Sequence, residues 1–127
     1  MENGEGSMAR IGLVAHDDKK DELCIWAEHH KHKLGQHELW GTGTTGSRVM
    51  AATGMEVTRL KSGPLGGDQQ LGAMIAEGKL DVLIFFIDPL SAQPHDVDVK
   101  ALTRLATLYD VLFANNKSTA DAVLAYL

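Results

Sequence analysis

The chain has 127 residues with 12 basic and 17 acidic side chains, so its formal net charge is −5, and 44% of its residues are hydrophobic. This length buries enough surface for one domain without a disulfide or a structural metal, and it excludes a second full domain. The acidic balance lacks the broad positive field that holds nucleic acids or anionic lipids, so we expect neither nucleic acid nor membrane as a partner; a small phosphorylated ligand stays compatible with it.

Residues 1–8 are polar and glycine-rich up to a second methionine, and we interpret them as a flexible leader or expression remnant before a single domain at 9–127. The leader lacks the basic and apolar regions of a signal peptide. The single cysteine, Cys24, excludes an internal disulfide, and no run of about 18 apolar residues offers a membrane span. We therefore expect a cytoplasmic protein.

Short apolar runs alternate with longer amphipathic stretches, which is typical of a parallel sheet with crossover helices. The expected strands are residues 10–15, 38–41, 56–60, 80–87 and 111–114. The fourth is almost continuously apolar, as an interior strand covered on both faces should be. The expected helices are residues 19–33, 45–53, 68–77, 97–109 and 118–127. The sequence predicts an α/β fold: a three-layer, doubly wound domain with a mainly parallel five-stranded sheet and right-handed crossovers.

Two helices carry further signals. In the first, the apolar residues at helical spacing predict a buried stripe of Leu23, Trp26, Ala27 and Leu34, and Cys24 is interpreted as structural. In the last, Ser118 is predicted to be the N-cap of a capping-box variant. The histidines at 29, 30, 32 and 37 lack the spacing and the extra ligands of a zinc site, so no metal is expected.

Polar and glycine-rich segments follow four of the expected strands. They are His16-Asp17, residues 41–46, residues 61–68 and residues 88–98. Because ligands bind beyond the carboxyl ends of strands in open α/β sheets, these segments should converge on one crevice.

The segment Gly-Thr-Gly-Thr-Thr-Gly at 41–46 predicts an anion seat. Its glycines let the backbone approach a ligand, Thr42, Thr44 and Thr45 supply hydroxyls, and the following helix presents amide groups at the positive end of its dipole. It lacks the spacing of a P-loop or a dinucleotide fingerprint, and an ordinary strand-to-helix turn is the alternative. Ser62-Gly63 can add donors and Lys20 a charge, although such a lysine is more often solvated.

Asp68 follows a glycine pair and begins an expected helix. One interpretation is an N-cap aspartate, and the other is a general base held at the crevice. A base that removes a proton next to a carbonyl needs an electrophile opposite, and a neutral His95 is chemically suited to stabilise an enediolate. Asp17 or Asp98 could orient that histidine or relay the proton.

Taken together, Leu-Val-Ala-His-Asp, Thr-Gly-Thr-Thr-Gly, Ser-Gly-Pro-Leu-Gly-Gly-Asp-Gln-Gln and Pro-His-Asp-Val-Asp closely resemble the methylglyoxal synthase family from about Arg10 onward. The resemblance implies a lyase without metal or other cofactor that converts dihydroxyacetone phosphate to methylglyoxal and inorganic phosphate. It also implies a homohexamer that is often inhibited by phosphate.

By position, the resemblance makes Asp68 the catalytic base and His95 the group that polarises the carbonyl and moves protons, with Asp17 and Asp98 as supporting acids. It assigns substrate and phosphate contacts to His95 and to His16, Lys20, Thr42, Gly43, Thr44, Thr45, Ser62 and Gly63. Elimination requires the bond to phosphate to stand perpendicular to the enediolate plane. We expect the donors at 42–45 and 62–63 to hold it there.

Two other functions fit parts of this pattern. A non-catalytic effector-binding module of the same fold, as in carbamoyl phosphate synthetase, would keep the anion seat without needing Asp68, His95 and Asp98 together. An isomerase-like proton transferase would share the first half of the mechanism and retain its phosphate.

Overall fold

The computed structural model describes residues 8–92 and 96–127. Five parallel strands form one sheet: β1 (Arg10–Ala15), β2 (Glu38–Thr42), β3 (Thr58–Leu60), β4 (Val82–Phe86) and β5 (Leu112–Ala114). The strand order is β3-β2-β1-β4-β5, so β1 is central and the apolar β4 lies beside it. After β3 the chain crosses to the other side of β1, which makes the gap between β1 and β4 the topological switch point.

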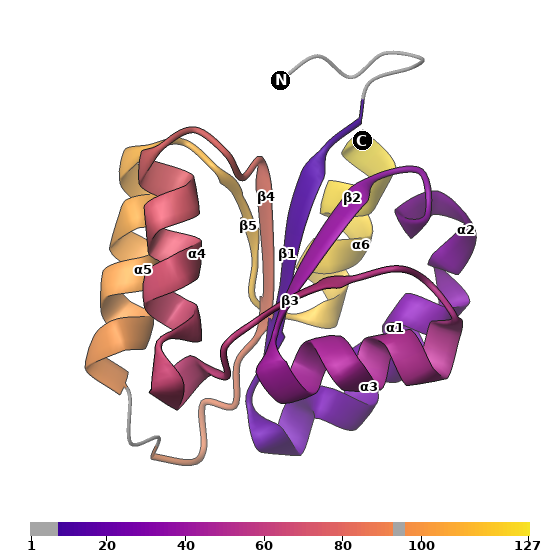
Figure 1. Ribbon diagram of the computed structural model, residues 1–127, viewed down its shortest axis with the longest axis horizontal. Coiled ribbons are helices and arrows are strands. Elements are labelled where there is room, and N and C mark those ends of the chain that lie inside the picture. Colours follow the sequence, from indigo (N-terminus) through magenta and orange to yellow (C-terminus); the bar gives the residue numbers. More distant parts are fainter. Residues whose placement is uncertain (1–7, 93–95) are drawn as a thin grey trace.

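Helices cover both faces of this sheet (Figure 1). On one face lie α4 (Gly67–Ala76) and α5 (Asp96–Leu108). On the other lie α1 (Lys20–His29), α2 (Lys31–Leu34), α3 (Gly43–Thr53) and α6 (Lys117–Tyr126). The short 3₁₀ turns η1 (Asp17–Lys19) and η2 (Gly63–Leu65) follow β1 and β3. The predicted three-layer α/β domain is confirmed.

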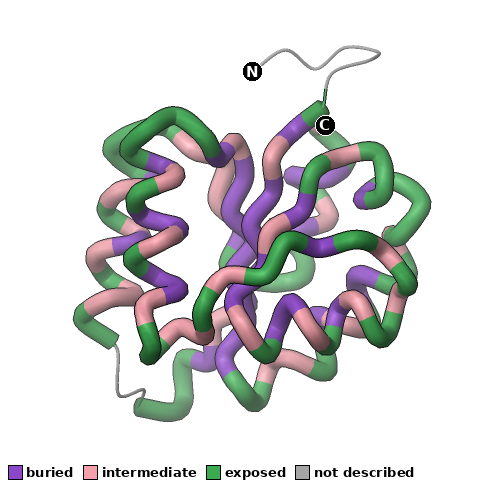
Figure 2. Tube along the Cα trace, viewed as in Figure 1, coloured by how far each residue is buried: buried purple, intermediate pink, exposed green. Residues whose placement is uncertain are grey.

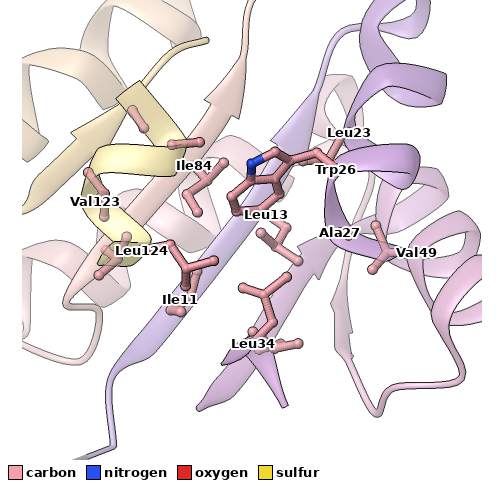
Figure 3. Close-up of a cluster of buried hydrophobic side chains, with 14 of the residues drawn as sticks. Ile11, Leu13, Leu23, Trp26, Ala27, Leu34, Val49, Ile84, Val123 and Leu124 are labelled. Atoms are coloured by element: carbon pink, nitrogen blue, oxygen red, sulfur yellow. The ribbon is translucent and has the colours of Figure 1, made fainter. Parts of the chain in front are cut away.

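Each face of the sheet has its own apolar core, because side chains alternate between faces along a strand. On one face, strand residues such as Ile11, Leu13 and Ile84 pack against the helices. The helix residues in this core are Leu23, Trp26 and Ala27 of α1, Leu34 of α2, Val49 of α3, and Val123 and Leu124 of α6 (Figure 3). The alternate positions Val14, Leu83 and Phe85 pack against Leu71 and Ile75 of α4 and Leu102 and Ala106 of α5. Figure 2 shows the buried residues concentrated along the inner strands, and β1 and β4 are almost entirely buried. The stripe predicted for the first helix is confirmed as buried.

Helix ends differ from the predictions by one or two residues, and three further differences concern a division or a cap. The first helix is divided at His30, whose backbone leaves the helical region with φ −109° and ψ 17°. The last helix begins at Lys117, and its N-cap is Asn116, whose side chain accepts from the Thr119 amide at 2.9 Å, so the Ser118 cap is wrong. Asp68 is the second residue of α4 and the N-cap is Gly66, so the N-cap interpretation of Asp68 is also wrong.

Candidate active site

A cleft of about 240 Å³ opens at the carboxyl edge of the sheet, over the switch point between β1 and β4. Val14 and Ala15 of β1 and Phe85 of β4 form part of its lining. The segments that follow β1, β2 and β3 contribute its polar lining: His16, Asp17, Lys20, Thr42, Thr44, Thr45, Ser62, Gly63 and Asp68. These residues are separated by up to 52 positions in the chain, and the sheet brings them to one small space. We call this space the β1–β4 cleft.

One wall of the cleft is suited to an anion. Thr42 and Thr45 are buried at the start of α3, whose first amides have no partner within the helix itself. The first turn of α3 contains no acidic residue, whereas those of α1, α4 and α5 do. The positive end of the α3 dipole is therefore not neutralised by a carboxylate of its own first turn, which favours a bound anion.

The second half of this wall comes from the segment after β3. A Cβ on Gly43 would lie 2.8 Å from the Ser62 amide nitrogen, so only glycine allows the two turns to approach so closely. The Gly43 amide also donates to the Lys61 carbonyl at 3.2 Å. Gly43 thus joins the two turns and is not among the residues that line the cleft; its substrate contact stays a prediction.

His16 is buried at the end of β1, with 5% of its surface exposed. Its Nδ1 accepts a hydrogen bond from the Asp88 amide at 2.9 Å, and its ring meets the edge of Phe85 with centroids 5.1 Å apart. A nitrogen that accepts from a backbone amide carries no proton, so the ring is the neutral tautomer with its proton on Nε2. The ring can therefore offer a donor to a ligand in the cleft that it lines.

Lys20 and Asp17 form an ion pair at the start of α1. The lysine side chain is only 14% exposed, whereas that of Asp17 is 91% exposed. Both residues line the cleft. The ammonium group is thus held at the cleft rather than extended into solvent, and it supplies a positive charge close to the anion seat.

Asp68 is a buried carboxylate, 3% exposed, on the first turn of α4. It lines the β1–β4 cleft and also a second, mostly apolar space of about 310 Å³ between α4 and α5. Asp98, on the first turn of α5, lines this second space with it. His95, which was predicted to act opposite Asp68, lies outside the described residues.

The sequence interpretation missed two contributors to the cleft. Phe85 was assigned only to a buried strand, although it packs against His16 and lines the cleft. The Asp88 amide fixes the His16 tautomer, and no side-chain pattern signals a backbone donor. The position of Phe85 near the end of an interior strand was the one available signal.

Among residues 8–92 and 96–127, no three His, Cys, Asp or Glu side chains are grouped as a metal site would require. A separate finding concerns membranes: in the part of the chain that the structure describes, no helix has both the length and the apolar character needed to cross one.

Comparisons with known proteins identify the family of the chain. The family described as "MGS-like domain" matches residues 22–114. The chain is 60% identical over 117 residues to methylglyoxal synthase of Agrobacterium fabrum, covering 91% of this chain and 92% of that protein. It is 56% identical over 119 residues to methylglyoxal synthase of Leptospira interrogans, covering 94% and 80%. A crystal structure of methylglyoxal synthase from Elizabethkingia anophelis superposes with a TM-score of 0.89 at 52% identity, covering 93% of this chain and 78% of that one.

Proposed function

Because the chain belongs to the family of MGS-like domains, we propose that it is a methylglyoxal synthase. Its reaction is the conversion of dihydroxyacetone phosphate to methylglyoxal and inorganic phosphate, a bypass of glycolysis. The observation that carries the proposal is the buried carboxylate of Asp68 in the same small cleft as an anion seat of hydroxyls and helix amides. A phosphate and the carbon atoms of a triose are of a size to occupy that cleft together.

The first step is removal of a proton from the hydroxyl-bearing carbon by Asp68. Burial restricts solvation of this carboxylate, which suits a base that must approach a carbon acid. The electrons left on carbon form an enediolate, whose oxygen needs a hydrogen-bond donor. His16 as the Nε2–H tautomer is suited to donate there, and His95 is proposed as the group that polarises the carbonyl and moves protons.

The second step is loss of phosphate. The π electrons of the enediolate expel the phosphate when its C–O bond stands out of the enediolate plane, and an enol remains. Protonation at the former phosphate-bearing carbon converts this enol to methylglyoxal. Thr42, Thr44, Thr45, Ser62 and Gly63 are proposed to hold the phosphate out of plane, and Lys20 to stabilise its developing charge. Asp17 and Asp98 are proposed as supporting acids.

A regulatory effector-binding module is the less favoured function. An anion seat alone would serve such a module, and it gives no reason to bury a carboxylate beside the seat. The two relatives described above, which match over most of this chain, are named methylglyoxal synthase.

We predict that the protein releases inorganic phosphate and a trappable dicarbonyl from dihydroxyacetone phosphate without added metal. Asp68→Asn removes the base while keeping the size of the side chain. It should abolish phosphate release and the exchange of substrate hydrogen with solvent deuterium, while inorganic phosphate still binds. An exchange rate equal to that of the wild type in Asp68→Asn would show that another group is the base, and no release by wild-type protein at high concentration would contradict the whole assignment.

We also propose that the chain forms a homohexamer and that inorganic phosphate inhibits it. The hexamer is supported by the family resemblance. Inhibition is supported by the anion seat, because free inorganic phosphate, the product, can occupy it. Competitive inhibition against dihydroxyacetone phosphate, weakened in Thr45→Val, is the expected kinetic result.

A further inference from the structure

Gly67 is the first residue of α4 and directly precedes Asp68. Its amide donates to the Ser62 carbonyl at 2.9 Å. A Cβ at this position would lie 2.1 Å from the Lys61 carbonyl oxygen and 2.9 Å from the Thr42 Cγ2. The backbone of α4 therefore touches both segments that build the anion seat, one residue before the carboxylate.

This contact leaves no room for adjustment by side chains. The Lys61 oxygen is a backbone atom, and it already accepts the Gly43 amide at 3.2 Å, so it is held by the turn on the other side of the seat. Any side chain at position 67 would move the start of α4 away from the seat by about 1 Å before the contact became an ordinary one. Asp68 would move with it.

From this packing we propose that Gly67 is a positioning residue that sets the distance between the Asp68 carboxylate and the bound phosphate ester. The inference rests on the proposed function and deepens it. The proposed phosphate donors lie on the segments at 42–45 and 62–63, whereas the base lies on α4, and Gly67 is where α4 contacts both segments. A change there alters the approach of base to carbon, whereas Thr44 and Thr45 on α3 are not among the atoms nearest to position 67.

The test is Gly67→Ala. We expect kcat to fall about 100-fold, the loss associated with a misplacement of about 1 Å, while KM changes less than about threefold. The exchange of substrate hydrogen with solvent deuterium should fall in step with phosphate release, because the base acts in both. Binding of inorganic phosphate, measured by calorimetry, should stay close to that of the wild type.

Gly72→Ala is the matched control on the same helix. Gly72 is also buried, and its added Cβ would meet only the Leu105 Cδ1 at 3.0 Å, the end of a flexible side chain. Its kcat should stay within about twofold of the wild type. This control separates displacement at the cleft from the general effect of a methyl group on α4.

Three outcomes decide the inference. Wild-type protein that is inactive on dihydroxyacetone phosphate overturns the proposed function and the inference with it. An active wild type with an equally active Gly67→Ala, or a variant whose KM and phosphate affinity weaken as much as kcat falls, overturns the inference alone. If Gly67→Ala fails to fold, Asp68→Glu displaces the carboxylate by one methylene on an intact backbone. A comparable loss of kcat supports a strict distance requirement, and retained kcat overturns it.

Discussion

At the scale of single residues, Asp110 stands out because its backbone φ is +56°, in the left-handed region that glycine adopts most easily. It follows α5, where the Val111 amide donates to the Ala106 carbonyl at 2.9 Å, the pattern of a Schellman helix end. Asp110→Gly should therefore raise the free energy of unfolding by about 0.5 kcal/mol, after the greater freedom of glycine in the unfolded chain is counted. Urea denaturation measures the change.

Asp110→Ala is the control for that prediction, because alanine tolerates a positive φ less well than aspartate does. It should lower the free energy of unfolding. Equal stability of the glycine and alanine variants would show that the backbone at position 110 is unstrained. Both variants should keep full lyase activity, since Asp110 lies at the amino edge of the sheet, opposite the cleft.

The sequence could predict which residues gather at the cleft, but it could not predict the tautomer of His16 or the burial of Asp68. The motif at 41–46 predicted the anion seat because glycines, threonines and a helix start are local features of the sequence. The tautomer of His16 depends on the Asp88 amide, 72 residues away, and the burial of Asp68 depends on the packing of α4 against the rest of the fold. Such long-range contacts leave no trace in local spacing.

At the scale of elements, the start of β1 is joined to the start of β4 by the Arg10–Asp81 ion pair. The guanidinium makes two hydrogen bonds of 3.0 Å to the carboxylate, and the Arg10 amide adds a third of 2.9 Å. Burial tends to raise the pKa of Asp81, but these bonds outweigh it and hold the pKa below the ordinary 3.8. The charged pair therefore stabilises the folded state.

Asp81→Asn should lower the free energy of unfolding by about 1 kcal/mol at pH 7, a value that allows for solvent screening of the partly exposed pair. Because the folded pKa is depressed, the contribution is complete above pH 3.8 and is lost as the pH falls through the lower folded value. The stability difference between wild type and variant should therefore shrink under strong acid. A difference that stays constant from pH 7 to pH 2 would assign the effect to packing.

Element types were predictable and their ends were less so. The apolar runs and amphipathic stretches located the five strands and the longer helices, because burial imposes periods of 2 and 3.6 on the sequence. The division of the first helix at His30 and the Asn116 cap arise from backbone geometry and one side-chain hydrogen bond. The break and the cap each depend on a single residue, so a pattern that repeats over many residues does not reveal them.

At the scale of the whole molecule, the binding of a dianionic substrate by an acidic chain depends on local groups. The net charge is −5, yet the anion seat contains a helix start without carboxylates, buried threonines and the ammonium of Lys20. Local donors act at contact distance, whereas the charge of the remaining surface is screened by salt within about 10 Å. The overall charge thus excludes polyanions without preventing the binding of one small phosphate ester.

Exposed apolar side chains at the carboxyl edge bear on the proposed assembly. Leu65, Leu90 and Val97 are 75%, 94% and 80% exposed, and they follow β3 and β4 on the edge that holds the cleft. Exposed apolar groups of this size favour contact with another surface. We predict a native mass about six times the 13.7 kDa of one chain, measured by light scattering after gel filtration.

Leu90→Asp should shift that mass downward, because a carboxylate in an apolar contact loses its hydration without gaining a partner. Leu108→Asp is the control. The Leu108 side chain is also exposed, but it lies at the carboxyl end of α5, away from the edge that holds the cleft. That variant should keep the mass of the wild type. Dissociation by Leu108→Asp with no change in Leu90→Asp would place the contact between copies at the amino edge instead, and a single-chain mass for the wild type at high concentration would contradict the assembly itself.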